Sequence, residues 1–343
     1  MEIEKWDHSS EKAWLWVKIP NIVSGTDTEI WIYYDKTKAD NTAYVGDPSD
    51  AVVHNVWDVN HKLSTHMRDD PDTSHVRDST VNANDGTKKA ANEPIVTTAG
   101  KIDDAQDFDG TDDKVEVPDA PSISGLSAIT VEAWVKMRTS GDYEGFVSKY
   151  GTGGGGDVEY ILGFSSGGNI RFRIYTSTDP FGIEVTSTMT LNAWHHVVGT
   201  YDGTNFILYR DGANVNSGTS SGNFVDAPTP VTIGSMATNG YFSDGIIDEP
   251  RISDSARTPA WIKASYESGR DHLLDFGSEE EYIGVTQTIS GTLTFTGTLT
   301  TVLKRLFRQA EVSIAVNQSV ISTKENDSVL AIDANKSVLS IKE

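Results

Sequence analysis

The stretch NAWHHVVGTYDGTNFILYRDG, residues 192–212, holds two runs of β-branched and aromatic residues around a short polar segment. Such runs favour β-strands, and the Asp-Gly between them is typical of a turn, so the stretch predicts a β-hairpin. Runs of the same kind recur on both sides of it, at residues 128–137, 145–150, 160–165, 169–176 and 231–235. Short strands that follow one another without intervening helices predict an antiparallel β-sandwich.

One helix is predicted near the end of the sandwich, in TPAWIKASYESG, residues 258–269. Thr258 is suited to cap its first turn, and Pro259 is suited to the first helical position. Gly269 follows the apolar and polar run as a stop signal.

The 343-residue chain divides into three regions. We expect an N-terminal β segment at residues 1–50, the sandwich at 51–270 and a β-rich C-terminal tail at 271–343. In the first region, AWLWVKIP (13–20) and TEIWIYYDK (28–36) predict two strands. Two strands are not stable alone, so this segment should lean on the sandwich.

The composition argues against several kinds of partner. The formal net charge is −22 and there is no cysteine. An acidic chain is a poor ligand for nucleic acid or for an anionic membrane, although it suits divalent cations. The first residues lack the basic and apolar parts of a signal peptide, and no apolar run approaches the roughly 20 residues of a membrane span. We therefore expect neither a nucleic-acid partner nor a membrane partner.

The tail contains an internal repeat. The pattern Asn-x-Ser-Val occurs at Asn317, Asn326 and Asn335, nine residues apart. Repeats this short cannot bury a core singly and must stack on one another or on another chain. Residues 311–343 therefore predict an element for self-association, with a homotrimer as the expected product. A loose β-rich tail is the alternative.

Five phrases of the middle region resemble, together and in this order, the laminin-G-like branch of the concanavalin A-like lectin/glucanase superfamily. They are VRDSTVNANDGT (76–87), GKIDDAQDFDGTDDKVEVPD (100–119), ITVEAWVK (129–136), the hairpin stretch quoted above, and GIIDEPRISDSARTPAWIKASYESG (245–269). The first region, through WVKIPNIVSGTDTEIWIYYDK (16–36), is similar to the last part of an uncharacterised β-rich module. The tail resembles the repetitive tails of phage-encoded structural proteins.

The resemblance implies an all-β jelly roll with a calcium ion between its opening turn and the strand near its end. Transferred to this chain, the calcium ligands would be Asp78, Asn82, Asp85 and Asp248. Carboxylate and amide oxygens suit the flexible coordination shell of calcium. The alternative is that Asp78 and Asn82 hydrogen-bond within their own turn.

The stretch GIIDEPRIS, residues 245–253, contains the two acids that could form a catalytic pair in a glycoside hydrolase. Glucanases of this superfamily carry acids at alternate strand positions, where both face one glycosidic bond. Asp248 and Glu249 are adjacent, so on a strand they point to opposite faces and cannot act together. We therefore predict a non-enzymatic protein. Glu249 and Arg251 share a face and should form an ion pair, and Pro250 predicts an edge strand or a bulge.

Glycan binding is the usual non-catalytic role of this superfamily. It needs exposed aromatic platforms with polar groups beside them. Aromatic residues in or beside predicted loops are the candidates, namely Tyr143, Tyr150, Phe181, Tyr241 and Phe242. Burial in the core is the alternative for most of them.

Taken together, these features predict a non-enzymatic structural or adhesion protein. We expect a virion surface component, such as a fibre or a capsid-decorating protein, that associates with itself and with other virion or surface proteins. Its lectin-like domain would recognise glycans at the virion surface or in the extracellular space. The alternatives are a carbohydrate-binding accessory module of a secreted protein and a degenerate glycoside hydrolase.

Overall fold

The structure is a computed structural model. It describes residues 1–275 except 10, 11, 23, 24, 26, 33–38, 89–92, 152–156, 238 and 239, and it describes the backbone of Val320–Thr323 and Leu330–Asp333. The chain forms two compact units, Met1–Asp275 and Phe276–Glu343. The predicted boundaries at residues 50 and 270 remain predictions. Most of the predicted tail lies outside the described residues, but β21 (Val320–Thr323) and β22 (Leu330–Asp333) form an antiparallel pair.

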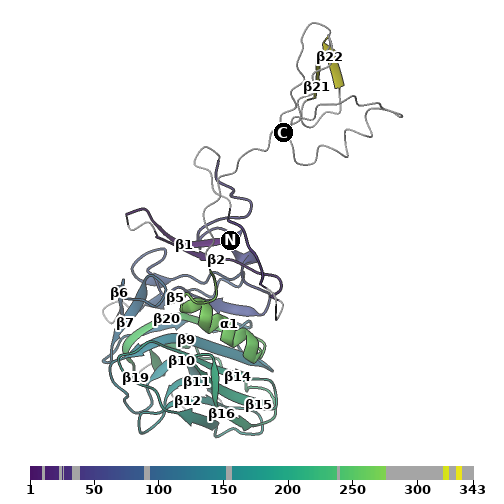
Figure 1. The fold of residues 1–343 in the computed structure, drawn as a ribbon. Helices are drawn as coiled ribbons and strands as arrows, with labels where there is room; N and C mark the ends of the chain where they lie inside the picture. Colours follow the sequence, from purple (N-terminus) through teal and green to yellow (C-terminus); the bar gives the residue numbers. More distant parts are fainter. Residues whose placement is uncertain are drawn as a thin grey trace. The chain divides into compact units, whose positions relative to one another are not determined.

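The first unit is an antiparallel β-sandwich, as the sequence predicts (Figure 1). Sheet I has the strand order β13-β12-β11-β10-β17-β8-β5-β4. Its strands are β4 (His75–Val76), β5 (Gly86–Lys88), β8 (Val115–Val117), β10 (Gly145–Tyr150), β11 (Val158–Phe164), β12 (Ile170–Ile174), β13 (Ile183–Ser187) and β17 (Val231–Ile233).

Sheet II has the order β16-β15-β14-β9-β20-β7-β6, and β3 also pairs with β20. Its strands are β3 (His61–Ser64), β6 (Ile95–Thr97), β7 (Ala105–Asp109), β9 (Ile129–Met137), β14 (His195–Tyr201), β15 (Asn205–Arg210), β16 (Ala213–Thr219) and β20 (Asp244–Ser253). The predicted hairpin is confirmed as β14–β15, where Val197 pairs with Arg210 and Tyr201 with Phe206.

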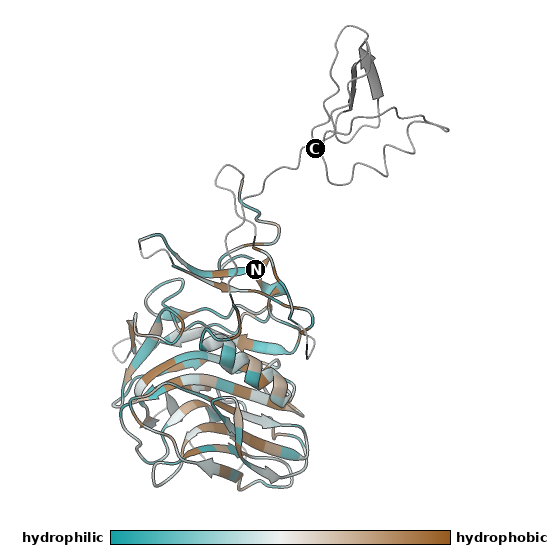
Figure 2. Cartoon of the chain, in the orientation of Figure 1, coloured by the Kyte–Doolittle hydropathy of each residue, from teal (hydrophilic) through white to brown (hydrophobic). Residues whose placement is uncertain are grey.

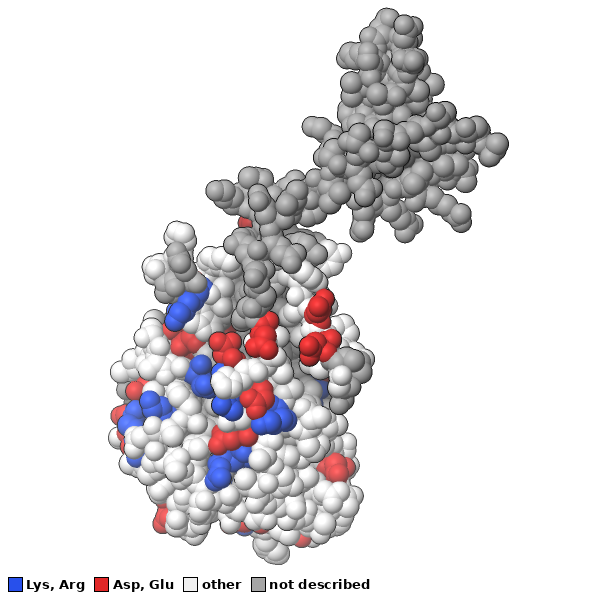
Figure 3. Space-filling model, in the orientation of Figure 1, with Lys and Arg blue, Asp and Glu red and all other residues white. Residues whose placement is uncertain are grey.

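The core lies between the two sheets. Side chains alternate along each strand, and one set from each sheet faces the other sheet. Val131 and Val135 of β9 meet Leu162 of β11 and Phe172 of β12 in one continuous buried cluster. Figure 2 shows the resulting mixture of apolar and polar residues along the strands of the sandwich, and Figure 3 shows basic and acidic side chains interspersed on one face of its surface. Because alternate side chains of each strand enter this core, the remaining side chains of sheet I point away from sheet II.

The helix α1 (Pro259–Gly269) covers the outer surface of sheet II. Ile262 packs against Val198 of β14 and Tyr209 of β15. The predicted capping is confirmed, because the Thr258 side chain accepts a hydrogen bond from the Trp261 backbone N–H at 3.2 Å. Within the described residues, no helix is long and apolar enough to cross a membrane.

The strands of the N-terminal segment differ from the prediction. The hairpin consists of β1 (Glu2–Asp7) and β2 (Lys12–Trp16), whereas the described residues 27–32 form no strand. The sequence EIEKWD lacks an apolar face, because the positions of β1 that are fully buried are Glu2 and Glu4. A search for apolar periodicity therefore missed β1. The hairpin does lean on the sandwich, as expected, since Trp57 donates a hydrogen bond to Glu2 at 2.8 Å.

Strand β20 is bulged at the predicted proline. Its register against β9 shifts between Asp248 and Arg251, and Glu249 adopts φ +50° in the left-handed region. A bulge is one of the few ways to place proline in a sheet interior. The alternative of an edge strand was wrong, because β20 lies between β9 and β7. Elsewhere, a short 3-10 helix (Val53–Asn55) precedes β3, and β18 (Ser235–Ala237) pairs with β19 (Gly240–Phe242).

Candidate functional site

The outer surface of sheet I carries a connected set of aromatic and arginine side chains. On β12, Phe172 and Ile174 belong to the core. Their neighbours Arg171 and Arg173, and Tyr175 just beyond the strand, therefore point away from that core. Arg171 (2% exposed) and Tyr175 (9% exposed) are nevertheless buried there by neighbouring side chains such as Met236. The sequence IRFRIY encodes this arrangement by strict alternation. These residues were missed as site candidates because the sequence search considered only loop aromatics.

Contacts join these side chains to two aromatic loops. The Arg171 guanidinium lies 5.2 Å from the centre of the Tyr143 ring, and Tyr143 meets Tyr241 edge to face at 5.8 Å. Arg173 lies 5.2 Å from the Tyr175 ring, which meets Tyr150 at 6.5 Å. We call this set the aromatic face; its members are Tyr143, Tyr150, Arg171, Arg173, Tyr175 and Tyr241.

A single carboxylate holds the two arginines of the aromatic face in place. Glu184 on the neighbouring strand β13 accepts from Arg171 at 3.2 Å and from Arg173 at 3.1 Å. Burial lowers the pKa of Arg171, and Glu184 counteracts this effect. Two guanidinium groups share one carboxylate, so the aromatic face keeps an excess of positive charge in an acidic protein.

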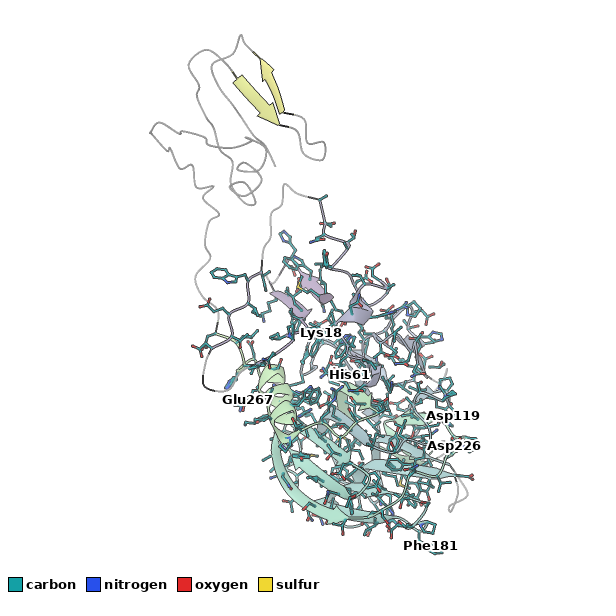
Figure 4. All side chains as sticks on the ribbon, turned by 90° about the vertical axis from the view of Figure 1, so that its right-hand side faces the viewer. Lys18, His61, Asp119, Phe181, Asp226 and Glu267 are labelled. Carbon is teal, nitrogen blue, oxygen red and sulfur yellow. The ribbon has the colours of Figure 1, made fainter. Side chains whose placement is uncertain are left out.

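The predicted ligand-binding aromatics divide into two groups. Tyr143, Tyr150 and Tyr241 belong to the aromatic face. Phe181 lies beside it, because Arg173 donates to the Phe181 carbonyl at 2.7 Å. Its side chain is 87% exposed, and Figure 4 shows it projecting from the end of the sandwich remote from His61. Phe242 is half-buried on β19 and makes no ring contact with the other four among the described residues.

A second notable group is a buried ion cluster between the N-terminal hairpin and sheet II. We use this name for Glu2, Glu4, His66, Glu249 and Arg251. His66 lies 3.0 Å from Glu2 through Nε2 and 2.7 Å from Glu249 through Nδ1. Arg251 donates to Glu249 at 2.5 Å, which confirms the predicted ion pair. Glu249, one of the two acids considered for catalysis in the sequence, therefore helps to join the N-terminal hairpin to sheet II.

Proton affinities in the buried ion cluster are strongly shifted. Burial raises the pKa of Glu4 to about 8, although His66 opposes this effect. Burial alone would lower the pKa of His66, but the carboxylates of Glu249, Glu4 and Glu2 raise it well above its usual value. Buried charges in such a cluster must be balanced by one another.

The predicted calcium ligands do not form a cage. Both Asp78 oxygens accept hydrogen bonds from protein donors, namely the N–H groups of Ser64, Thr80 and Asn84 and the Thr80 hydroxyl. Asn82 bonds to its own turn and to the His61 carbonyl, and Asp85 accepts from the Asp78 N–H. Asp248 accepts from the N–H groups of Lys101 and Ile102.

Among the described acids and histidines, the groups of three that converge are Glu4–His66–Glu249 and the turn acids Asp109, Asp112 and Asp113. The four predicted residues therefore do not fit a shared calcium ion in this arrangement. Calcium binding stays a prediction.

Three further side chains form a hydrogen-bonded chain beside a surface hollow of about 240 Å³. The Thr190 hydroxyl lies 2.7 Å from His195 Nε2, and His195 Nδ1 lies 2.7 Å from Asp211. This order of groups is shared with nucleophile–base–acid relays. Asp211 also accepts from the His196 backbone N–H at 3.1 Å, so this series of hydrogen bonds connects β14 to the β15–β16 turn. His196 lies 2.9 Å from Glu132 through Nε2, so both histidines hold neighbouring strands and turns together.

Comparison with known families accounts for much of this fold. Residues 109–263 match the concanavalin A-like lectin/glucanases superfamily. Residues 1–60 match a domain of unknown function (DUF2341). Both resemblances inferred from the sequence are thereby confirmed for these regions, and the concanavalin A-like region is a lectin-like β-sandwich. The resemblance of the tail to phage proteins stays a prediction. A search of curated proteins found no match.

Solved structures with a similar fold come from toxins and from a glycan-degrading enzyme. The binding domain of Paraclostridial Mosquitocidal Protein 1 is 15% identical with a TM-score of 0.49, covering 61% of this chain and 52% of its own. Domain 4 of the extracellular arabinanase AbnA from Geobacillus stearothermophilus, in complex with arabinotriose, is 21% identical with a TM-score of 0.47, covering 60% and 98%. The binding domain of botulinum neurotoxin serotype G is 11% identical with a TM-score of 0.48, covering 60% and 50%. This chain thus spans about half the length of the two toxin domains.

Proposed function

We propose that this protein binds glycans, without catalysis, through the aromatic face of its concanavalin A-like domain. The observation that carries the proposal is the group of partly exposed side chains Tyr143, Tyr150, Arg173 and Tyr241, which the buried Arg171 and Tyr175 support from below. Tyrosine rings offer apolar surfaces on which the C–H faces of sugars can stack, and their hydroxyls supply hydrogen bonds. Arg173 and the exposed Phe181 would contact the same ligand at the rim.

The positive charge of the aromatic face narrows the ligand class. Arg171 is 2% exposed and also donates to the Met236 sulfur, so Arg173, which is 26% exposed, is the guanidinium of this pair that a ligand could reach. Guanidinium groups bind carboxylates and sulfates more strongly than they bind neutral hydroxyls. An acidic oligosaccharide is therefore the ligand class that this surface favours.

The test is a glycan array followed by titration of the best ligand. Tyr241 is 51% exposed, so Tyr241→Ala removes a platform without opening the core. We expect at least a tenfold loss of affinity, because exposed aromatic anchors typically contribute more than about 1 kcal/mol to binding. Tyr44→Ala is the matched control, since Tyr44 is 72% exposed on the N-terminal segment. Equal losses in both variants, or no glycan bound by the full chain, would contradict the proposal.

We further infer that the protein acts on the surface of a particle or cell, with virion decoration as the specific role. The support is the nine-residue repeat, whose first two copies contribute β21 and β22 to one antiparallel pair. A short repeat that pairs its own strands presents edges on which further copies can add. The partners would be two further copies of this chain and other surface proteins.

Deleting residues 311–343 tests the assembly role. We expect the full chain to have about three times the mass of the truncated chain by light scattering, because the truncated protein should be a monomer. Circular dichroism of the truncated chain serves as the control for folding of the sandwich. Equal masses for the two proteins would refute self-association through the tail.

A further inference from the structure

The buried ion cluster contains a carboxylate oxygen that finds no donor. Glu4 is almost fully buried, and Trp16 donates to its Oε2 at 2.7 Å. Its Oε1 has no hydrogen-bond partner among the described residues. An unpaired buried carboxylate oxygen is costly, so this atom calls for a ligand. The ligand atoms of Glu4, His66 and Glu249 all lie within 4.8 Å of one another.

With all three of its carboxyl groups ionised, the buried ion cluster is electrically balanced only if Glu4 takes up a proton or a cation binds. Glu2, Glu4 and Glu249 supply three negative charges, whereas Arg251 and a protonated His66 supply two positive charges. The adjacent Glu132 pairs with His196 at 2.9 Å and also lies 3.6 Å from Arg251. A divalent cation bound to a neutral His66 would make the five residues electrically neutral. Nδ1 of His66 would release its proton when the cation binds.

The surroundings of His66 match those of a metal-binding histidine. Nε2 lies 3.0 Å from Glu2, which also accepts from the Ser79 hydroxyl at 2.6 Å and from the Trp57 indole. A carboxylate on the far nitrogen orients the ring and fixes Nδ1 as the free ligand atom. Nδ1 lies 3.4 Å from Glu4 Oε2, close to the roughly 3.3 Å between tetrahedral zinc ligands.

We propose that Glu4, His66 and Glu249 bind one divalent transition-metal cation of the zinc class. One nitrogen and carboxylate oxygens form a ligand set that suits zinc and its neighbours better than calcium or magnesium. Glu249 Oε1 lies 2.7 Å from Nδ1 and must move back by about 0.6 Å to admit the ion.

The cation would fasten the N-terminal hairpin to the sandwich. Glu4 comes from β1, His66 follows β3 and Glu249 lies at the bulge of β20. These ligands come together only when the hairpin is docked. Binding to the native state alone must raise the melting temperature. This role is independent of the aromatic face and of any glycan.

The experiment uses the full chain, stripped of metal with a chelator and then titrated with Zn²⁺. We expect one Zn²⁺ per chain by calorimetry and a rise in melting temperature of roughly 5 °C at a hundredfold excess over Kd. Co²⁺ should quench tryptophan fluorescence at one equivalent, because the rings of Trp16 and Trp57 lie 5.5 and 6.0 Å from that of His66. Ca²⁺ should produce neither effect at the same concentration.

Two variants test whether Zn²⁺ binds at Glu4, His66 and Glu249. Glu4→Gln keeps the shape of the side chain and should lower the affinity for Zn²⁺ at least tenfold. Asp112→Asn alters the separate acidic turn formed by Asp109, Asp112 and Asp113 and should leave binding unchanged. Zinc binding that survives Glu4→Gln, or that is lost with Asp112→Asn, would overturn the proposal. A full chain that shows no quenching by Co²⁺ would overturn it as well, whatever the folding of the variants.

Discussion

Replacing Arg251 by methionine should lower the free energy of unfolding by about 3–5 kcal/mol. Arg251 is buried between Glu249, at 2.5 Å, and Glu132, at 3.6 Å. Its guanidinium also lies 4.5 Å from the Trp16 ring and 5.2 Å from the Trp57 ring. Methionine fills similar volume, so the loss would come mainly from two carboxylates left buried without their cation.

Urea denaturation in the presence of a chelator measures this loss at constant metal content. Arg138→Met is the matched control, because Arg138 also pairs with two acids, Asp107 and Asp244, but its side chain is 40% exposed. Exposed ion pairs contribute less than about 1 kcal/mol each. If Arg251→Met cost no more than Arg138→Met, the buried ion cluster would not stabilise the fold.

Stability should fall between pH 5 and pH 8 because of Glu159. Burial raises the pKa of Glu159 to about 7, against the opposing effect of Lys149. The folded state therefore holds this proton more tightly than the unfolded state, whose pKa is about 4.5. The contribution of Glu159 is complete below pH 4.5 and is lost as the pH rises through 7. The loss amounts to at most roughly 3 kcal/mol.

Glu159→Gln isolates this contribution, since glutamine stays neutral at every pH. We expect the variant to match the wild type at pH 5 and to exceed its unfolding free energy at pH 8. Glu116→Gln on strand β8 is the control, because the Glu116 side chain is 36% exposed. The measurement is urea denaturation at four pH values between 5 and 8. Parallel stability curves for Glu159→Gln and the wild type would contradict the prediction.

The fold was largely predictable because apolar alternation marks most strands of the sandwich. The runs at residues 128–137, 145–150 and 192–212 all fall on observed strands. Strand β1 escaped prediction because Glu2 and Glu4 occupy its buried positions, and their partner His66 is more than 60 residues away. An alternating apolar pattern in the sequence predicts which residues are buried. A buried acid is stabilised by partners far away in the sequence, so a local pattern does not predict it.

The candidate site was predictable only in part. Loop aromatics such as Tyr143 and Tyr241 were found from their position beside turns. Arg171 and Arg173 were not, although their alternation with Phe172 and Ile174 carries the signal. Which of the two sets on a strand faces the core depends on the partner sheet, which a single strand does not reveal. The adjacency of Asp248 and Glu249, by contrast, could be read from the sequence and argued against a catalytic pair before the surroundings of Glu249 were known.

The pairing around the bulge of β20 limits where this protein can be cut into independently folding fragments. The family match begins at residue 109, but β3 and β7 pair with β20 and precede that point. Thr65, just after β3, donates its N–H to the Pro250 carbonyl inside the bulge. A fragment cut at the family boundary would leave the middle strand of sheet II with an uncovered flank, open to pairing with other molecules. The smallest portion that behaves as an independent module is therefore larger than the portion that sequence comparison recognises.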